Sequence, residues 1–289
     1  MTDMTSVVDQ PLTGELSAAA QAVASRLMGA APLGIAFSGG VDSSVLLALA
    51  VRALGPGQVV AILAVSPSLA ADERLAAHQV AAIIGARIVE IQTKEGDNPA
   101  YRANGLDRCF YCKDELFTRI EDEVAGSYGL AAVAYGENAD DMRRPDRPGS
   151  RAASQHKVLR PLADAGLGKT AVRAIARALQ LPSADKPAAP CLASRIPHHQ
   201  EVSAAKLAQI EAAEKALRML GFADCRVRHH GEVARIELPA DELVRAVSAP
   251  AREQIRAAVT AAGFRFAAVD LAGIQSGAFT MSLLPVTRE

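Results

Sequence analysis

The sequence predicts an α/β fold, in which a parallel sheet is covered by helices, followed by a smaller α+β domain at the C-terminal end. In the first part, short apolar runs alternate with segments of helical spacing, and these runs consist mostly of Val, Ile, Leu and Ala. Strands of this composition are buried on both faces, and strands that alternate with helices pair in parallel. The alternation stops in the last third of the chain, which indicates a separate, smaller domain.

The first part contains four expected strands, each preceded by a segment of helical spacing. These helix and strand pairs lie at 16–30 and 33–38, 42–54 and 58–66, 73–85 and 86–93, and 113–129 and 130–137. Ligands of such sheets bind at the carboxyl ends of the strands. We therefore expect the glycine turn at 38–44, the loop at Gly136 and the segment around Cys109 to share one edge of the sheet.

The remaining chain begins with a polar loop at 138–168 and a helix at 168–181. A proline-rich connection at 181–199 has little periodicity, and a connection of this length without regular structure is usually functional or disordered. A helix at 202–222, a hairpin that turns at Gly231, helices within 240–262 and a strand at 264–271 are expected to follow. We place the domain boundary between residues 1–185 and 186–289.

Composition excludes several classes of protein. The 289 residues contain 31 Lys and Arg against 32 Asp and Glu, a balance that does not indicate a nucleic-acid partner. There is no apolar run of about 18 residues and no basic, apolar leader at the start, so we expect no membrane association and a cytoplasmic location. Four cysteines in such a chain do not indicate a disulfide framework.

The stretch SGGVDSS, residues 38–44, lies between an expected strand and an expected helix. Backbone N–H groups of a glycine-rich turn and of a helix N-terminus bind phosphate, and the three serine hydroxyls add hydrogen-bond donors. Asp42 can hold a metal or another part of the nucleotide. The lysine of the Walker pattern is missing, and the dinucleotide pattern G-x-G-x-x-G is absent.

SGGVDSS resembles the phosphate loop of the PP-loop ATP pyrophosphatases, which cleave ATP between the α- and β-phosphates. The resemblance implies an adenine nucleotide alpha hydrolase-like domain that adenylates a carboxylate or carbonyl oxygen and releases pyrophosphate. A nitrogen or sulfur nucleophile then replaces the oxygen. The residues that the resemblance assigns to ATP are Ser38, Gly39, Gly40, Asp42, Ser43 and Ser44.

Three cysteines are relevant to the identity of the nucleophile that replaces the oxygen. Cys109 and Cys112 form a C-x-x-C motif just before an expected helix, and Cys191 lies in the proline-rich connection. Taken alone, the motif is consistent with a redox dithiol, a zinc site that lacks one ligand, or chance. Three cysteines at one edge also suit an iron–sulfur cluster with one open iron. We expect Cys225, in the hairpin, to be a small buried residue.

The order of motifs along the chain resembles the ATP-dependent sulfur transferases that build the nickel-pincer cofactor of lactate racemase. These motifs are SGGVDSS, RCFYCKDELF, GENADD, RPGSRAA, LPSADKPAAPCLASRI and RVRHHGEVARIE, and the resemblance spans about residues 16–275. In that family ATP adenylates a carboxylate of pyridinium-3,5-biscarboxylic acid mononucleotide, and sulfur displaces AMP to form a thiocarboxylate. GENADD departs from the more frequent GTNADD of the family.

The resemblance also implies cofactors and partners. One subgroup gives up the sulfur of a single cysteine in the PCLASR loop, here Cys191, and is left with dehydroalanine. Another uses three cysteines, here Cys109, Cys112 and Cys191, to hold a [4Fe-4S] cluster whose extra sulfide is donated; this chain matches the second subgroup. The implied cofactors are ATP, Mg²⁺ and the cluster. The resemblance also implies a homo-oligomer with six subunits and transfer of the product to a nickel-inserting protein.

Further residues are assigned through the same resemblance. Asp140 or Asp141 in GENADD would bind Mg²⁺ or orient ATP, with Asp141 as the preferred residue. Three arginines would hold the phosphate of the mononucleotide, since guanidinium groups suit that geometry, and an acidic partner accompanies them. Alternate residues of a strand face the same side, which suits two of the arginines. The residues are Arg195, Arg226, Arg228 and the acidic Glu214.

Three other functions share parts of this pattern. A tRNA thiolase of the PP-loop class can use three cysteines and a cluster, but this chain has a near-neutral charge and no zinc-finger motif. An amidotransferase-type synthetase that makes GMP or NAD shares SGGVDSS and does not need three cysteines. A nucleotide sensor would bind ATP through the loop without chemistry.

Overall fold

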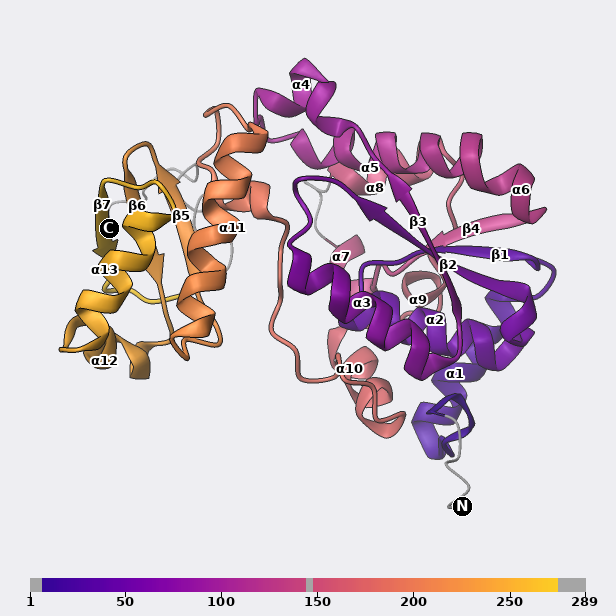
Figure 1. Cartoon of the computed structure of the whole chain (residues 1–289). Coiled ribbons are helices and arrows are strands. Elements are labelled where there is room, and N and C mark those ends of the chain that lie inside the picture. Colours follow the sequence, from indigo (N-terminus) through magenta and orange to yellow (C-terminus); the bar gives the residue numbers. More distant parts are fainter. Residues whose placement is uncertain (1–6, 144–147, 275–289) are drawn as a thin grey trace, which may run out of the picture. The chain divides into compact units, whose positions relative to one another are not determined.

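The computed structural model describes residues 7–143 and 148–274, which form two compact units. The first unit contains residues up to Glu95 and Cys109–Ala189. The second contains Pro190 onward together with Gly96–Arg108, a segment that interrupts the first unit in the sequence. In Figure 1 the second unit is coloured orange to yellow, apart from its purple segment with the helix labelled α4.

The first unit is built on a parallel sheet of four strands in the order β3-β2-β1-β4. Strand β1 is an inner strand and pairs with both β2 and β4. Leu33 of β1 lies opposite Val59 of β2 and opposite Ala132 of β4. The strands are β1 (Leu33–Ala36), β2 (Val59–Val65), β3 (Arg87–Gln92) and β4 (Ala132–Tyr135). The predicted α/β class with a parallel sheet is confirmed.

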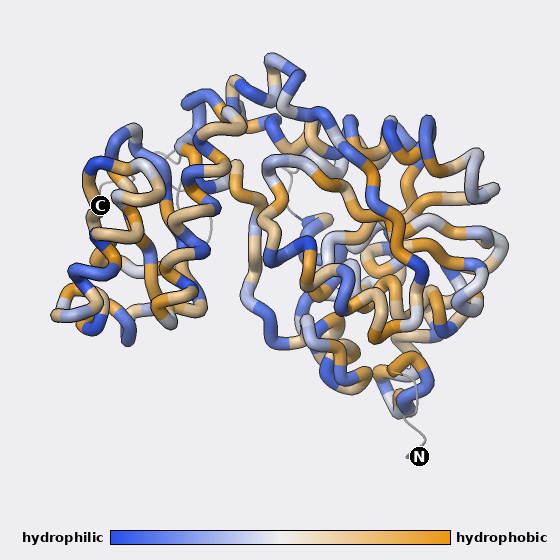
Figure 2. The backbone as a smooth tube through the Cα atoms, in the orientation of Figure 1, coloured by the Kyte–Doolittle hydropathy of each residue, from blue (hydrophilic) through white to orange (hydrophobic). Residues whose placement is uncertain are grey.

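Helices cover both faces of this sheet, and the alternation of side chains along β2 shows why. Val59, Ala61 and Leu63 belong to one core, while Val60 and Ile62 belong to another, because successive residues of a strand point to opposite faces. Both cores are apolar, so β2 is hydrophobic without interruption, as Figure 2 shows in orange.

The first of these cores is packed around helix α2, which contacts α1, α3 and α10. The second core is formed by α5, the π-helical segment η4 and α8. The helices of the first unit are α1 (Gly14–Leu27), α2 (Val41–Leu54), α3 (Ala71–Ile84), α5 (Arg108–Arg119), η4 (Ile120–Ala125), α6 (Gly126–Tyr128), α7 (Ala139–Met142), α8 (Pro148–Gln155), α9 (Pro161–Asp164) and α10 (Lys169–Ala178). Short 3₁₀ turns lie at Val7–Asp9, Pro56–Gln58 and Glu95–Asp97.

The second unit is α+β, as predicted for the C-terminal part. Strands β5 and β6 form an antiparallel hairpin, and β7 pairs in parallel with β6. The predicted turn at Gly231 is confirmed, and this glycine has a φ of 65°. The elements are α4 (Pro99–Arg102), a 3₁₀ turn at Leu192–Arg195, α11 (Ala204–Met219), β5 (Arg226–His230), β6 (Val233–Glu237), a 3₁₀ turn at Ala240–Glu242, α12 (Leu243–Val247), α13 (Ala251–Ala261) and β7 (Phe266–Val269).

One boundary differs from expectation in a way that matters for the site. Helix α5 begins at Arg108 and not at 113, so the C-x-x-C motif lies within the first turns of the helix and not before it. Charged and aromatic residues around the two cysteines weakened the helical signal at this position. Within residues 7–143 and 148–274, no helix is long and apolar enough to cross a membrane.

Candidate functional site

The phosphate loop joins the end of β1 to the first turn of α2. Gly40 precedes the helix as its N-cap, and its carbonyl accepts hydrogen bonds from the hydroxyls of Ser43 at 3.0 Å and Ser44 at 2.9 Å. The Ser43 hydroxyl also accepts from the backbone N–H of Ser38 at 3.3 Å. These bonds fold the turn back on the N-terminus of a 14-residue helix, where backbone N–H groups and the helix dipole favour an anion.

Gly39 meets two requirements that only glycine satisfies. Its φ is 70°, in the left-handed region that other residues rarely adopt, and a Cβ placed on it would lie 2.9 Å from the Cα of Ala77 in α3. Helix α3 therefore backs the turn directly. This close approach explains why the predicted phosphate-binding turn contains glycine at this position.

Asn138 links the phosphate loop to the loop that follows β4. Its side-chain oxygen caps α7 by accepting from the backbone N–H groups of Asp140 and Asp141, at 3.0 and 3.1 Å. Its amide nitrogen donates to Asp141 at 2.8 Å and to Asp42 at 3.3 Å. The structure thus brings together Asp42 and the GENADD segment, 96 residues apart, at one edge of the sheet as the sequence predicted.

A lysine from a distant helix completes this group, and no sequence motif predicted it. Lys169 is the first residue of α10, and its Nζ lies 2.6 Å from a carboxylate oxygen of Asp42. Its backbone N–H donates to Asp140 at 2.7 Å. The signal available in the sequence was the dipeptide Gly-Lys at the start of a helix, but its position in space depends on how α10 packs against α2.

Two buried carboxylates, those of Glu137 and Glu95, were also not predicted from the sequence. Glu137 has a fully buried side chain that accepts hydrogen bonds from the hydroxyls of Tyr135, at 2.5 Å, and of Ser150. Burial, with the bond to Glu137 next, raises the pKa of Tyr135, so its hydroxyl remains a donor. Glu95 accepts from the Ser66 hydroxyl at 2.5 Å, and its other oxygen is buried without a partner among the described residues.

The four cysteines occupy different environments and form no disulfide within the described residues. Cys109 is exposed and Cys112 is half-buried, three residues apart on α5 and therefore on the same face of the helix. Cys191 is exposed and precedes the 3₁₀ turn at Leu192–Arg195 as its N-cap. Cys225 is buried, and this burial, with nearby Glu214, raises the pKa of its thiol to about 12.

No group of three His, Cys, Asp or Glu side chains is arranged around a metal position in residues 7–143 and 148–274. The cysteine donor set is chemically suited to an iron–sulfur cluster, because thiolates are the usual ligands of such clusters. Asp42, Asp140 and Asp141 offer oxygen ligands of the kind that Mg²⁺ prefers. In the structure these carboxylates accept hydrogen bonds from Lys169 and Asn138.

The arginines assigned to the substrate phosphate lie in the second unit and are buried. The exposed fractions of Arg195, Arg226 and Arg228 are 5%, 7% and 4%. Each is paired with a carboxylate: Arg195 with Glu214 at 2.9 Å, Arg226 with Asp224 at 2.9 Å, and Arg228 with Glu237 at 2.7 Å. Glu214 is therefore the acidic partner of Arg195, and it also accepts from the backbone N–H of Val227 at 3.0 Å.

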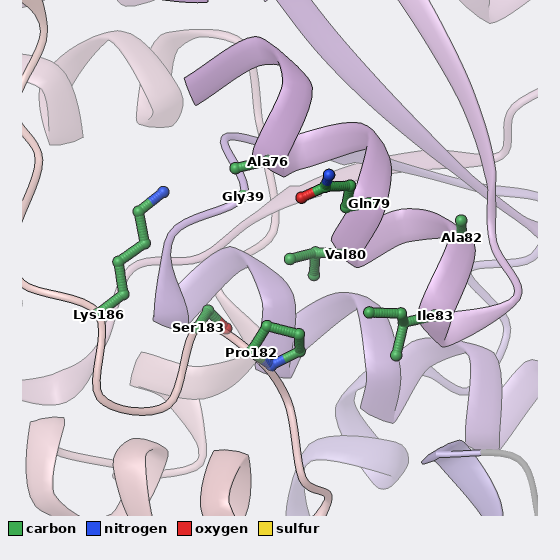
Figure 3. A pocket seen from close by; sticks show the side chains of 9 residues that line it. All are labelled: Gly39, Ala76, Gln79, Val80, Ala82, Ile83, Pro182, Ser183 and Lys186. Atoms are coloured by element: carbon green, nitrogen blue, oxygen red, sulfur yellow. The ribbon is translucent and has the colours of Figure 1, made fainter. Parts of the chain in front are cut away.

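A cavity of about 450 Å³ adjoins the phosphate loop on the side of α3 (Figure 3). Mostly apolar side chains of α3 line it, together with Gly39, Pro182 and Ser183. The hydroxyl of Ser183 is buried there without a hydrogen-bond partner among the described residues. Lys186 also lines the cavity, and its Nζ pairs with Glu73 at 2.6 Å.

Comparison with known proteins gives matches to both parts of this structure. The asparagine synthase family matches residues 16–142, which contain the phosphate loop and the four parallel strands. A protein from Synechocystis described as uncharacterised is 41% identical over 243 residues, which cover 84% of this chain and 90% of the relative. An uncharacterised protein of Methanocaldococcus jannaschii is 32% identical over 160 residues, which cover 55% of this chain and 62% of the relative.

A further relative carries a specific name. The pyridinium-3,5-bisthiocarboxylic acid mononucleotide synthase of Lactiplantibacillus plantarum is 34% identical over 247 residues, covering 84% of this chain and 87% of the synthase. The match extends over both units and is not confined to the nucleotide-binding part. The chain is therefore an enzyme of the PP-loop class and belongs to the family of the pyridinium-3,5-bisthiocarboxylic acid mononucleotide synthases.

Proposed function

We propose that the chain uses ATP to adenylate a carboxylate of pyridinium-3,5-biscarboxylic acid mononucleotide and then replaces the activated oxygen by sulfur. The observation that carries this proposal is the 34% identity to the Lactiplantibacillus plantarum synthase over 84% of the chain. The phosphate loop and the Asp42–Asn138–Asp141 contacts support it from the geometry.

In the first step, an oxygen of the substrate carboxylate attacks the α-phosphorus of ATP, and the bond to the bridging oxygen of the β-phosphate breaks. Pyrophosphate leaves with that electron pair. We propose that the backbone N–H groups of the loop, the hydroxyls of Ser38, Ser43 and Ser44, and the ammonium of Lys169 hold the phosphates and stabilise the negative charge. We propose that Asp42 and Asp141 hold Mg²⁺ together with the nucleotide, because carboxylate oxygens are ligands that Mg²⁺ prefers.

In the second step, sulfur attacks the carbonyl carbon of the acyl adenylate, and AMP leaves. We propose that Cys109, Cys112 and Cys191 hold a [4Fe-4S] cluster at this site. When bound, a cluster with three protein ligands supplies an iron that can carry an additional sulfide. The helical spacing of Cys109 and Cys112 supports this, because both thiols lie on one face of α5.

The second unit is proposed to bind the substrate. We propose that Arg195, Arg226 and Arg228 bind the phosphate of the mononucleotide, since guanidinium groups suit a phosphate, and that their carboxylate partners fix the orientation of these side chains. We further propose that residues 1–185 bind ATP and that residues 186–289 bind the mononucleotide. A homo-hexamer and delivery of the product to a nickel-inserting protein complete the proposal.

The proposed reaction is tested by incubating the protein with ATP, Mg²⁺ and the biscarboxylate mononucleotide. The expected products are AMP, pyrophosphate and a thiocarboxylate, each identified by mass spectrometry. Formation of AMP only with tRNA as acceptor would instead indicate a tRNA thiolase. Binding of ATP with no AMP from either acceptor would contradict an adenylating enzyme.

The sulfur source is tested separately, by anaerobic reconstitution with iron and sulfide. We expect bound iron in the wild-type protein, its loss in Cys109→Ala and Cys112→Ala, and its retention in the matched control Cys225→Ala, whose thiol is buried. A colourless wild-type protein whose activity survives both substitutions would overturn the cluster. Cys191 would then be the donor: its thiolate displaces AMP to give a thioester. Loss of the Cα proton and cleavage of the Cβ–S bond then release the thiocarboxylate and leave dehydroalanine, seen as loss of H₂S mass from residue 191.

A further inference from the structure

The loop that carries Cys191 is held by arginine side chains that bind its backbone. Carbonyl oxygens of this loop accept hydrogen bonds from three guanidinium groups, and charge-assisted bonds of this kind are stronger than those between neutral groups. The three bonds run from Arg195 Nη1 to Pro190 at 2.7 Å, from Arg108 Nη1 to Ala193 at 2.9 Å, and from Arg228 Nη1 to Ser194 at 2.9 Å.

Each of these arginines is fixed in turn by an acceptor of its own. Glu214 holds Arg195, and Glu237 holds Arg228 through two bonds of 2.9 and 2.7 Å. Arg108, only 8% exposed, donates to the side-chain oxygen of Asn104 at 2.6 Å. The first two arginines come from the same part of the chain as the loop, whereas Arg108 comes from the inserted segment 96–108.

Asn104 binds the same loop a second time. Its amide nitrogen donates to the carbonyls of Ile196, at 3.2 Å, and Pro197, at 2.8 Å, while its own carbonyl accepts from the N–H of His199 at 3.0 Å. Asn104 is completely buried and has a φ of 55°, a conformation that asparagine adopts more readily than most residues. Its side chain and backbone are therefore both used to fasten residues 196–199.

Arg108 also has a special place in the sequence, because it is the first residue of α5 and Cys109 follows it directly. The guanidinium that binds the Cys191 loop thus belongs to the residue at which the cysteine-bearing helix begins. Neither Asn104 nor Arg108 belongs to the phosphate loop or to the arginines assigned to the substrate. Their contacts are made with backbone atoms of the cysteine loop.

We propose that Asn104 and Arg108 are positioning residues, which fix the backbone of the Cys191 loop to the inserted segment 96–108 so that the sulfur chemistry has a preformed ligand loop. The proposal rests on the function proposed above for the role of Cys191. The fastening of the loop is a separate property of the chain, and it is measurable whether or not the cysteines bind a cluster.

Two variants and a matched control test the fastening by hydrogen–deuterium exchange of the full-length protein. Arg108→Met removes the donor, and Asn104→Gly removes the amide while accepting the positive φ. Arg102→Met removes a charge from the same segment, but its side chain is half-exposed and pairs with Glu201 at 3.5 Å. We expect exchange of peptides covering residues 190–199 to become about 10-fold faster in the first two variants only.

Iron retention gives the second readout, after anaerobic reconstitution. We expect Arg108→Met and Asn104→Gly to lose iron several times faster than the wild type, Arg108→Lys to restore most of the retention, and Arg102→Met to match the wild type. Circular dichroism identifies any variant that fails to fold. Unchanged exchange at 190–199 in both folded variants would overturn the proposal. If exchange at 190–199 is faster in the variants but the wild-type protein binds no iron, the contacts of Asn104 and Arg108 with the loop are supported and the cluster is rejected.

Discussion

At the scale of single residues, Asp42 is the point where three separate parts of the sequence meet. The carboxylate lies in the first turn of α2, accepts from Asn138 after β4, and pairs with Lys169 at the start of α10. A PP-loop lacks the lysine that the Walker pattern carries next to its glycines. Lys169 supplies a positive charge at the same turn from 127 residues away.

Replacing Lys169 by Met is expected to raise the KM for ATP about 10-fold, the effect of losing one charge-assisted bond to a phosphate. The free energy of unfolding should change by less than about 1 kcal/mol, because the pair with Asp42 is partly exposed. Steady-state kinetics and urea unfolding measure the two effects. Lys215→Met, an exposed lysine on α11, is the control. An unchanged KM would show that Lys169 does not act on ATP.

Replacing Gly136 by Ala is expected to disturb the phosphate loop from the opposite side. A Cβ at Gly136 would lie 2.6 Å from the backbone nitrogen of Ser43, so the loop after β4 must move away from α2. We expect a loss of about 1–3 kcal/mol in stability and a clear loss of ATP affinity, by thermal melting and calorimetric titration. Gly57→Ala, which has open space around its Cβ, should behave as wild type. Equal ATP affinity in both variants would refute this contact.

At the scale of elements, the β5–β6 hairpin is unusual because it buries charges. Arg228 on β5 and Glu237 on β6 have exposed side-chain fractions of 5% and 0%. Removing Arg228 leaves a buried carboxylate whose remaining ion pair within the described residues is with Arg235, at 3.4 Å. We expect Arg228→Met to cost about 3 kcal/mol, and the double variant with Glu237→Gln to cost less than the two single changes together.

This comparison is made by urea unfolding followed by circular dichroism, since the chain contains no Trp. Additive costs would mean that the two side chains do not stabilise each other. The exposed pair Arg252–Glu253, treated in the same way, should show almost no coupling.

A second element-scale prediction concerns pH. His156, at the end of α8, reaches Asp114 at 3.0 Å and Glu121 at 2.9 Å. Partial burial lowers the pKa of His156, but the bonds to these carboxylates outweigh it and raise the pKa above 6.5. The stabilisation is therefore complete below pH 6.5 and is lost as the pH rises through the raised pKa.

The expected loss is below about 1 kcal/mol, since both carboxylates are exposed. Urea unfolding at several pH values should show this slope in the wild type and not in His156→Gln. An identical slope in the variant would assign the pH dependence to other groups.

At the scale of the whole molecule, the two units should respond differently to nucleotide. We expect α,β-methylene ATP with Mg²⁺ to slow hydrogen exchange in residues 37–44 and 136–142, because phosphates would occupy the N–H groups of the loop. Peptides of α11 and of the β5–β6 hairpin should exchange as before. Slower exchange throughout the second unit, or none at the phosphate loop, would contradict ATP binding at this turn alone.

Much of the first unit could be predicted, because its strands and helices are encoded locally. The uninterrupted apolar run of β2 reflects burial on both faces, and the glycine turn at 38–44 is a local motif. The start of α5 at Arg108 could not be predicted, since polar and aromatic residues around Cys109 hide the helical pattern. The inserted segment 96–108 likewise has no local signal that assigns it to the second unit.

The α/β class, the phosphate loop, the cysteine motifs and the family could all be predicted from the sequence, because they depend on local patterns and on residue order. Only the tertiary structure showed that Lys169 reaches Asp42, that Glu137 is buried, and that Asn104 and Arg108 bind the Cys191 loop. The physical reason is the same in each case. These contacts join residues that are far apart in the chain or satisfy buried polar groups, so they depend on how complete elements pack and not on the residues beside them.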